Sequence, residues 1–118
     1  MSTTLTSARH EVASFAHWRE GDADRAIAML RRCVGLHRIN PQAVVNHYYC
    51  RAESRDARLW RRLVALGFAA RFGTIVPGMD LFCVTSHGAF ELLDLSRSHA
   101  LAIGRLVPAG GEQGGAAE

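Results

Sequence analysis

His47 and Cys50 have the spacing that most resembles a chemical site, because they stand three positions apart and both side chains can bind a metal. Zinc needs four protein ligands, or three and a water molecule. Cys33, His37 and His87 could complete such a set, but none of them forms a second closely spaced pair. His47 could also act as a general base, yet no acid close in sequence could orient its ring. We interpret it as a structural histidine and predict neither a metal nor a cofactor.

Patterns for a nucleophile or a phosphate loop are weaker still. Ser86 directly precedes His87, but neighbours in sequence do not form a catalytic pair, and serine is common at the start of a helix. The glycine pairs at 110–111 and 114–115 lie in a polar tail that no helix follows, unlike a phosphate-binding loop. Cys83 stands between two apolar residues and is typical of a core strand. We therefore predict a protein that is not an enzyme and has no catalytic residues.

Arginine is the strongest functional signal, because all 14 basic residues are arginines and the middle of the chain concentrates them. Residues 31–71 hold nine arginines and two acids, whereas the rest of the chain is net acidic. Guanidinium groups suit phosphate and carboxylate recognition, so this stretch predicts an electropositive surface. The absence of lysine extends over the whole chain, which favours codon usage in a GC-rich genome as its cause.

The arginines that matter most fall on one predicted helix, which spans residues 54–66. Arg55, Arg58 and Arg62 are spaced i, i+3, i+7 and therefore share the face opposite the leucines. They could contact phosphates or base edges in a DNA groove, or an acidic protein surface. A solvated helix face without any partner is the alternative. The full set of candidate binding residues is Arg51, Arg55, Arg58, Arg61, Arg62, Arg71, Ile75, Val76 and Met79.

The elements that position these residues follow from periodicity and turn residues. Apolar spacing predicts helices over residues 7–19, 22–34 and 54–66, with Asp22 or Asp24, and Ser54, as caps and Gly35 and Gly67 as stops. Alternation predicts two strands, 68–72 and 80–85, joined by a Pro-Gly turn, and a last helix from Thr85 or Ser86 toward Ile103. Residues 36–50 read as less regular.

These elements predict an α+β, mostly helical fold: a bundle of about four helices with one antiparallel β-hairpin, which by resemblance is winged-helix-like. We expect three segments, namely an N-terminal helical extension (1–20), the winged-helix-like domain (21–106) and a disordered Gly-rich tail (107–118). No apolar run is long enough to span a membrane, and no secretory pattern opens the chain. Three cysteines without a C-x-x-C pair favour a reducing cytoplasm.

The predicted order of helix, helix, hairpin and helix resembles a winged helix-turn-helix module, with residues 63–68 ending its recognition helix and 82–88 leading into its last helix. A narrower resemblance covers about residues 27–93. The runs Leu-Arg-Arg-Cys-Val-Gly-Leu (30–36) and Asn-His-Tyr-Tyr-Cys (46–50), with those later segments, are similar to short uncharacterised bacteriophage and prophage proteins. That resemblance implies a phage accessory protein in the bacterial host cytoplasm, with no established activity.

The loop of the presumed wing separates two hypotheses. DNA-gripping wings usually present cations, but this loop offers Ile75, Val76 and Met79. If these side chains are exposed they indicate a protein contact, whereas the alternative is that the loop folds back onto Trp60 or Phe72.

The first hypothesis is a non-enzymatic inhibitor that docks on a host protein or nucleoprotein machine, for example a CRISPR effector, in the manner of an anti-CRISPR protein. The second is a winged helix-turn-helix regulator that binds duplex DNA. A homodimer through Phe90, Leu93 and Leu101 of the last helix would suit the regulator.

Overall fold

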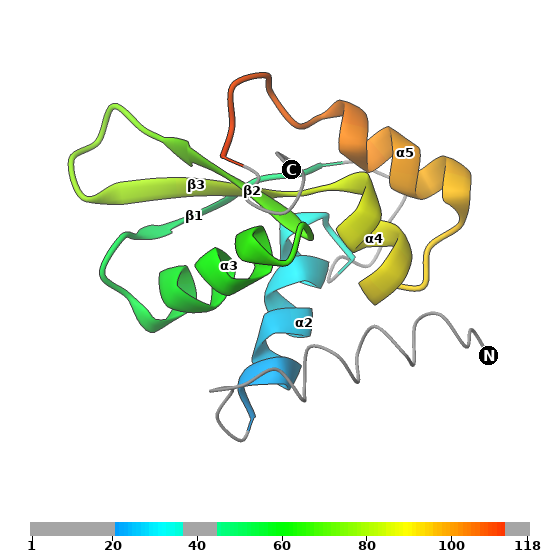
Figure 1. The fold of residues 1–118 in the computed structure, drawn as a ribbon, viewed down its shortest axis with the longest axis horizontal. Helices are drawn as coiled ribbons and strands as arrows, with labels where there is room; N and C mark the ends of the chain where they lie inside the picture. The colour runs from blue at the N-terminus through cyan, green and yellow to red at the C-terminus, as the bar shows by residue number, and fades with distance from the viewer. Residues whose placement is uncertain (1–20, 37–44, 113–118) are drawn as a thin grey trace.

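The computed structural model describes residues 21–36 and 45–112, and these form one α+β unit with four helices and a three-stranded antiparallel sheet (Figure 1). In chain order the elements are α2 (Asp22–Cys33), β1 (Tyr48–Arg51), α3 (Arg55–Ala65), β2 (Ala69–Gly73), β3 (Met79–Val84), α4 (Ser86–Leu92) and α5 (Arg97–Arg105). The predicted α+β class is confirmed. The predicted extension over 1–20 and the end of the predicted tail, 113–118, lie outside the described residues.

The predicted ends of α3 are confirmed by their hydrogen bonds. The Ser54 hydroxyl accepts a bond from the Ala57 amide at 3.1 Å, which satisfies an amide that the first turn leaves free. At the other end Gly67 has φ +83°, and the Phe68 amide reaches back to the Leu63 carbonyl at 2.9 Å. This is the Schellman arrangement, which needs a left-handed residue that glycine adopts without strain.

The predicted cap of α2 is wrong. Gly21 occupies the N-cap position, and no side chain caps the helix there. The Asp22 carboxylate is instead buried and accepts a bond from Arg55 of α3. This carboxylate is thus bound by a cation that lies 33 positions away in the chain.

The predicted hairpin is present as β2 and β3, but a third strand joins it. β1 pairs with β3 from Tyr48↔Phe82 to Arg51↔Met79, so the strand order is β1-β3-β2. The prediction of a single hairpin is therefore corrected. β1 also separates α2 from α3, so these two helices are not consecutive elements joined by a short turn. A four-residue strand whose paired residues lie 28–34 positions away leaves little trace in local periodicity.

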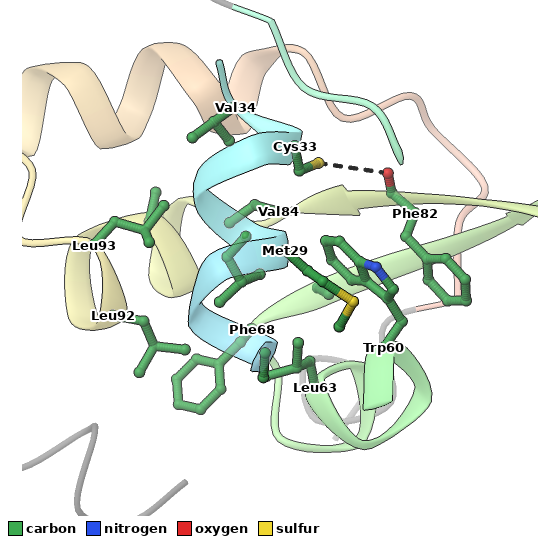
Figure 2. Close-up of a cluster of buried hydrophobic side chains, with 14 of the residues drawn as sticks. Met29, Cys33, Val34, Trp60, Leu63, Phe68, Phe82, Val84, Leu92 and Leu93 are labelled. Carbon is green, nitrogen blue, oxygen red and sulfur yellow. Dashed lines mark hydrogen bonds between the residues drawn. The ribbon is translucent and has the colours of Figure 1, made fainter. Parts of the chain in front are cut away.

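Helices α2 and α3 cover one face of the sheet and enclose the core between them (Figures 1 and 2). Trp60 of α3 is fully buried, with its ring 5.3 Å from that of Tyr48 and stacked 5.2 Å from that of Phe82. From α2, the Cys33 thiol donates a hydrogen bond to the Phe82 carbonyl (Figure 2). Burial raises the pKa of this thiol and keeps it protonated. The contacts of the Trp60 ring with the rings of Tyr48 and Phe82 fix the sheet against α3.

The predicted last helix is two helices. Thr85 caps α4 as expected, because its hydroxyl accepts a bond from the Gly88 amide at 3.0 Å. The chain then breaks at Asp94, which has φ +54°, and Ser96 caps α5 by accepting a bond from the His99 amide. The two helices pack beside each other at the end of the sheet away from the hairpin loop (Figure 1).

Part of the predicted disordered tail packs against the sheet. The amide and carbonyl of Glu112 bond to the carbonyl and amide of Arg71, at 2.8 and 2.9 Å. Just before it, the backbone of Gly111 passes so close to Phe72 that a Cβ there would lie 2.3 Å from the ring. Residues 107–112 therefore return from α5 to the outer edge of β2.

Asn46 connects three elements through a buried amide that the sequence analysis did not single out. Its Nδ2 donates to the carbonyls of Val84 and Ile103, at 2.8 and 3.0 Å, and its Oδ1 accepts from the Val84 amide at 2.7 Å. The Cys33 sulfur also lies 3.4 Å from Oδ1, so its one proton is shared between this oxygen and the Phe82 carbonyl. One side chain thus satisfies polar groups of β3, α5 and α2 where strand pairing ends.

Replacing Asn46 by alanine should lower the free energy of unfolding by about 3 kcal/mol, because three buried backbone groups lose their partner. Urea denaturation measures this change. The neighbouring exposed His47→Ala is the control and should change stability by less than about 0.5 kcal/mol. Equal stability of the two variants would contradict the role given to the amide.

Asp56 links α2, β1 and α3 on the helical side of the sheet. It accepts two bonds from Arg25, at 2.8 and 3.0 Å, and one from the Tyr48 hydroxyl at 3.0 Å. The Arg25 guanidinium holds the pKa of the Asp56 carboxyl below its usual range. Burial, and then the Asp56 carboxylate, raise the pKa of Tyr48 to about 12.

The Tyr48 hydroxyl should make the stability of the protein sensitive to alkali. Its folded pKa lies above the value of about 10 of an unfolded tyrosine, so folding favours the neutral phenol. The contribution is complete below pH about 10 and is lost as the pH rises toward 12. Tyrosinate absorbance should show a step near pH 12 that Tyr48→Phe removes and Tyr49→Phe retains. A step that survives in Tyr48→Phe would show that the assignment is wrong.

Candidate functional site: the hairpin tip and the outer face of α3

The predicted binding residues fall into two groups. One gathers at the hairpin end of the sheet and comprises Arg51, Arg61, Arg71, Ile75, Val76 and Met79; the other lies on the outer face of α3 and comprises Arg55, Arg58 and Arg62. The first group comes from three strands, one loop and α3, so only the tertiary structure brings it together. The second follows from helical spacing alone.

The β2–β3 loop projects from the sheet and is held by its own hydrogen bonds (Figure 1). The Thr74 hydroxyl lies 3.0 Å from the carbonyls of Val76 and Met79 and accepts a bond from the Val76 amide. Pro77 and Gly78 form a turn in which the Met79 amide bonds to the Val76 carbonyl and Gly78 has φ +77°. These are features of the predicted type II turn, in which glycine accommodates the positive φ.

The side chains of this loop point into solvent. Ile75 is 100% exposed and Val76 is 55% exposed, whereas Met79 is half-buried. The alternative that the loop folds back on Trp60 or Phe72 is wrong, because Trp60 is enclosed by other aromatic rings and Phe72 lies against Gly111. We call residues 75–78 the hairpin tip. Ile75 and Val76 therefore form a small apolar surface at the end of the loop.

Asp80 lies at the base of the hairpin and holds two of the predicted arginines. Its buried carboxylate accepts two bonds from Arg71 of β2, both at 3.1 Å, and one from Arg61 of α3 at 3.4 Å. The carboxylate raises the pKa of Arg71, which stays charged. Arg61 also donates to the Ala52 carbonyl. Sequence reasoning missed Asp80, although its alternation with Phe82 and Val84 marks it as facing the helices.

The face of the sheet away from α2 and α3 continues from the hairpin tip. Residues that pair directly share a face, so Tyr49, Leu81 and Phe72 lie together on it, as do Arg51 and Met79. Tyr49 is 58% exposed and Arg51 is exposed. An apolar, partly open surface therefore extends back from the tip, with Arg51 as the cation on it.

The outer face of α3 forms a hollow of about 250 Å³, which we call the α3 hollow. It is lined by Asp22, Arg55, Arg58, Leu59 and Arg62. The predicted common face of the three arginines is thus confirmed. Arg55 is ion-paired with buried Asp22, however, so its charge is balanced within the protein.

The predicted dimer face on the last helix is not formed as expected. Leu93 is buried in the core, while Phe90 is half-buried with the Arg97 guanidinium 5.1 Å above its ring. Leu101 alone of the three is well exposed, at 48%. Leu93 is the C-cap residue of α4, directly before the left-handed Asp94.

The candidate chemical residues are dispersed. His47 is exposed beside Tyr49, His87 stacks on Phe68, and Cys33 is buried beneath the sheet. Across residues 21–36 and 45–112 no three His, Cys, Asp or Glu side chains gather as a metal site would require, and His37 lies outside this range. No helix among the same residues is long and apolar enough to cross a membrane.

Comparison of the chain with protein-family models, with curated proteins and with solved structures found no match.

Replacing Asp80 by asparagine should release Arg61 and Arg71 toward solvent. We expect a loss of about 2 kcal/mol in the free energy of unfolding, because charge-assisted bonds to a buried group disappear. We also expect elution from a heparin column at higher salt than for Glu53→Gln, which changes the net charge equally at an exposed site. Identical elution of the two variants would mean that Asp80 does not hold these cations back.

Proposed function

We propose that the protein is a non-enzymatic docking module that binds a partner protein through the hairpin tip. The observation that carries this proposal is the exposure of Ile75 and Val76 at the end of an internally braced loop. Burial of one such side chain contributes about 1.5–3 kcal/mol, so the two could anchor a moderate interface. Because the loop is fixed before binding, little ordering entropy opposes the contact.

Charge around the tip supports a partner surface with carboxylates around an apolar pocket. Arg51 is exposed at the strand end beside the loop, and the Ala52 amide bonds directly to Gly78. Arg61 and Arg71 stand behind the tip and keep exposed fractions of 41% and 35% despite their bonds to Asp80. Cations at the rim of an apolar contact mainly set orientation and association rate.

The resemblance to phage proteins implies a biological role for this docking surface. A protein of this kind would act in the bacterial host cytoplasm as an inhibitor of a host protein or nucleoprotein machine, with a CRISPR effector as one candidate. The hairpin tip would occupy a site on that machine to which one of the machine's own components, or its substrate, must bind. This role rests on the resemblance, whereas the docking surface rests on the exposed residues.

A DNA-binding regulator with a winged-helix-like body remains the second candidate, because Arg58 and Arg51 are both exposed. Two observations weigh against it. Arg55, Arg61 and Arg71 already bond to carboxylates of the protein, and the hairpin tip carries no cation where a wing would meet a phosphate. The protein-docking proposal therefore accounts for more of these surface residues than the DNA-binding proposal does.

The double substitution Ile75→Ser and Val76→Ser should abolish partner binding without unfolding the protein. The matched control is Leu101→Ser with Leu106→Ser, since these leucines are exposed by 48% and 43% on another part of the surface. Affinity capture from bacterial host lysate, followed by mass spectrometry, should recover a partner with the wild type and the control only. With the purified partner, the tip variant should bind at least about thirtyfold more weakly.

Two results would contradict the docking proposal. One is a tip variant with the melting temperature and partner affinity of the wild type. The other is wild-type binding to random duplex DNA at low salt that Arg58→Gln abolishes and the tip variant leaves unchanged, which would favour the regulator. If the partner is a nuclease complex, its cleavage rate with and without the protein tests the inhibitory role.

A further inference from the structure

The two edges of the sheet differ in how their backbone groups are bonded. At the outer edge of β2, Glu112 bonds to both the amide and the carbonyl of Arg71, so the chain itself closes part of this edge. β1 is the other edge strand, and no described strand pairs with its outer side. An edge strand whose amides and carbonyls face outward is a template on which another extended segment can pair.

Three backbone groups of β1 face outward without a partner among the described residues. The Ala52 amide bonds to the Gly78 carbonyl, and bonding alternates along an antiparallel strand, so the groups of Tyr49 and Arg51 face away from β3. The Arg51 carbonyl accepts bonds from Ser54. The Tyr49 amide, the Tyr49 carbonyl and the Arg51 amide are therefore available to an added strand.

A groove of about 580 Å³, which we call the α2–β1 groove, lies beside this strand. It is lined by Arg25, Ala28, Met29 and Arg32 of α2 and by Tyr48 of β1. No residue of β3 lines it, so it lies on the outer side of β1. Side chains that are directly opposite on paired strands share a face, so a residue opposite Tyr48 on an added strand points toward this groove.

Charge beside the β1 edge favours an acidic occupant. Arg25 is bound to Asp56, so its charge is balanced within the protein. Arg32 and Arg51 are exposed, and neither forms an ion pair with a described residue. Arg32 lines the groove and Arg51 lies on β1 itself. Opposite charges on paired strands attract, so carboxylates on the added segment would complement these two cations.

We propose that the outer edge of β1, together with the α2–β1 groove, binds an extended acidic peptide of a partner protein, which adds a fourth strand to the sheet. The segment is antiparallel to β1, as are both existing strand pairs. Its residue opposite Tyr49 exchanges two backbone bonds with it, an acidic residue lies opposite Arg51, and an apolar side chain opposite Tyr48 enters the groove. The ligand class is therefore a peptide of alternating acidic and apolar residues.

Fluorescence anisotropy with the whole protein and a labelled, capped pentapeptide, Glu-Val-Glu-Val-Glu, tests the site. We expect saturable binding below about 1 mM. N-methylation of the central glutamate should weaken binding at least about tenfold, because its amide donates to the Tyr49 carbonyl. N-methylation of either valine, whose amide faces away from β1, should weaken binding by less than about threefold.

Variants of the protein separate backbone pairing from charge. Tyr49→Pro removes the outward amide and keeps the bonds to β3, so it should bind the pentapeptide at least about tenfold more weakly than Tyr49→Ala, which retains the amide. If Tyr49→Pro does not fold, the N-methylated peptides test the same pairing. Arg32→Gln should weaken binding about fivefold. Arg31→Gln removes an exposed cation outside the groove and should bind like the wild type.

The edge site goes beyond the docking proposal and shares no residue with the hairpin tip. The hairpin tip variant should therefore bind the pentapeptide like the wild type, and Tyr49→Pro should leave the hairpin tip exposed. Failure of one proposal is thus distinguishable from failure of the other.

Three outcomes would overturn the edge proposal. The first is no saturable binding of the pentapeptide up to about 1 mM. The second is equal binding of Glu-Glu-Glu-Val-Val, which has the same composition without the alternation and would show attraction to overall charge. The third is a dimer in sedimentation experiments that Tyr49→Pro abolishes, which would show that a second copy of the chain occupies the edge.

Discussion

The buried carboxylate of Asp80 is the constraint on which the functional surface depends. It binds Arg71 of β2 and Arg61 of α3, so it ties the hairpin to the helix that packs beneath it. A buried carboxylate without these cations would be costly, and the cations in turn lose their freedom to reach a ligand. The same interaction therefore fixes where the hairpin tip points and reduces the charge available around it.

This constraint changes how the arginine-rich middle of the chain is understood. In the sequence the arginines of residues 31–71 form one electropositive stretch, but in the structure Asp22 binds Arg55, and Asp80 binds Arg61 and Arg71. Both acids belong to the part of the chain that is net acidic in sequence. Folding thus pairs arginines of the basic stretch with acids from outside it. Within the described residues, the exposed apolar tip and the arginine-lined α3 hollow are two surface features that remain.

Local features were predicted well, because their causes lie within a few residues. Ser54 and Thr85 cap helices through their own hydroxyls, and Gly67 ends α3 by adopting a left-handed conformation. The outward position of Arg58 follows from its spacing on the helix. By contrast, β1 was missed because its partner strand is distant in sequence, and the division between α4 and α5 depends on a left-handed Asp94 that apolar periodicity does not reveal.

The sequence by itself therefore determined the α+β class, the hairpin, the face shared by Arg55, Arg58 and Arg62, and the absence of cation from the loop, since each depends on residue type and short-range spacing. The tertiary structure decided the rest. Whether Ile75 is exposed, which carboxylate each arginine meets, and whether Leu93 faces the core all depend on segments that meet only after the chain has folded. Long-range ion pairing and burial, which no local pattern encodes, determined which of these side chains are exposed and which are bound within the protein.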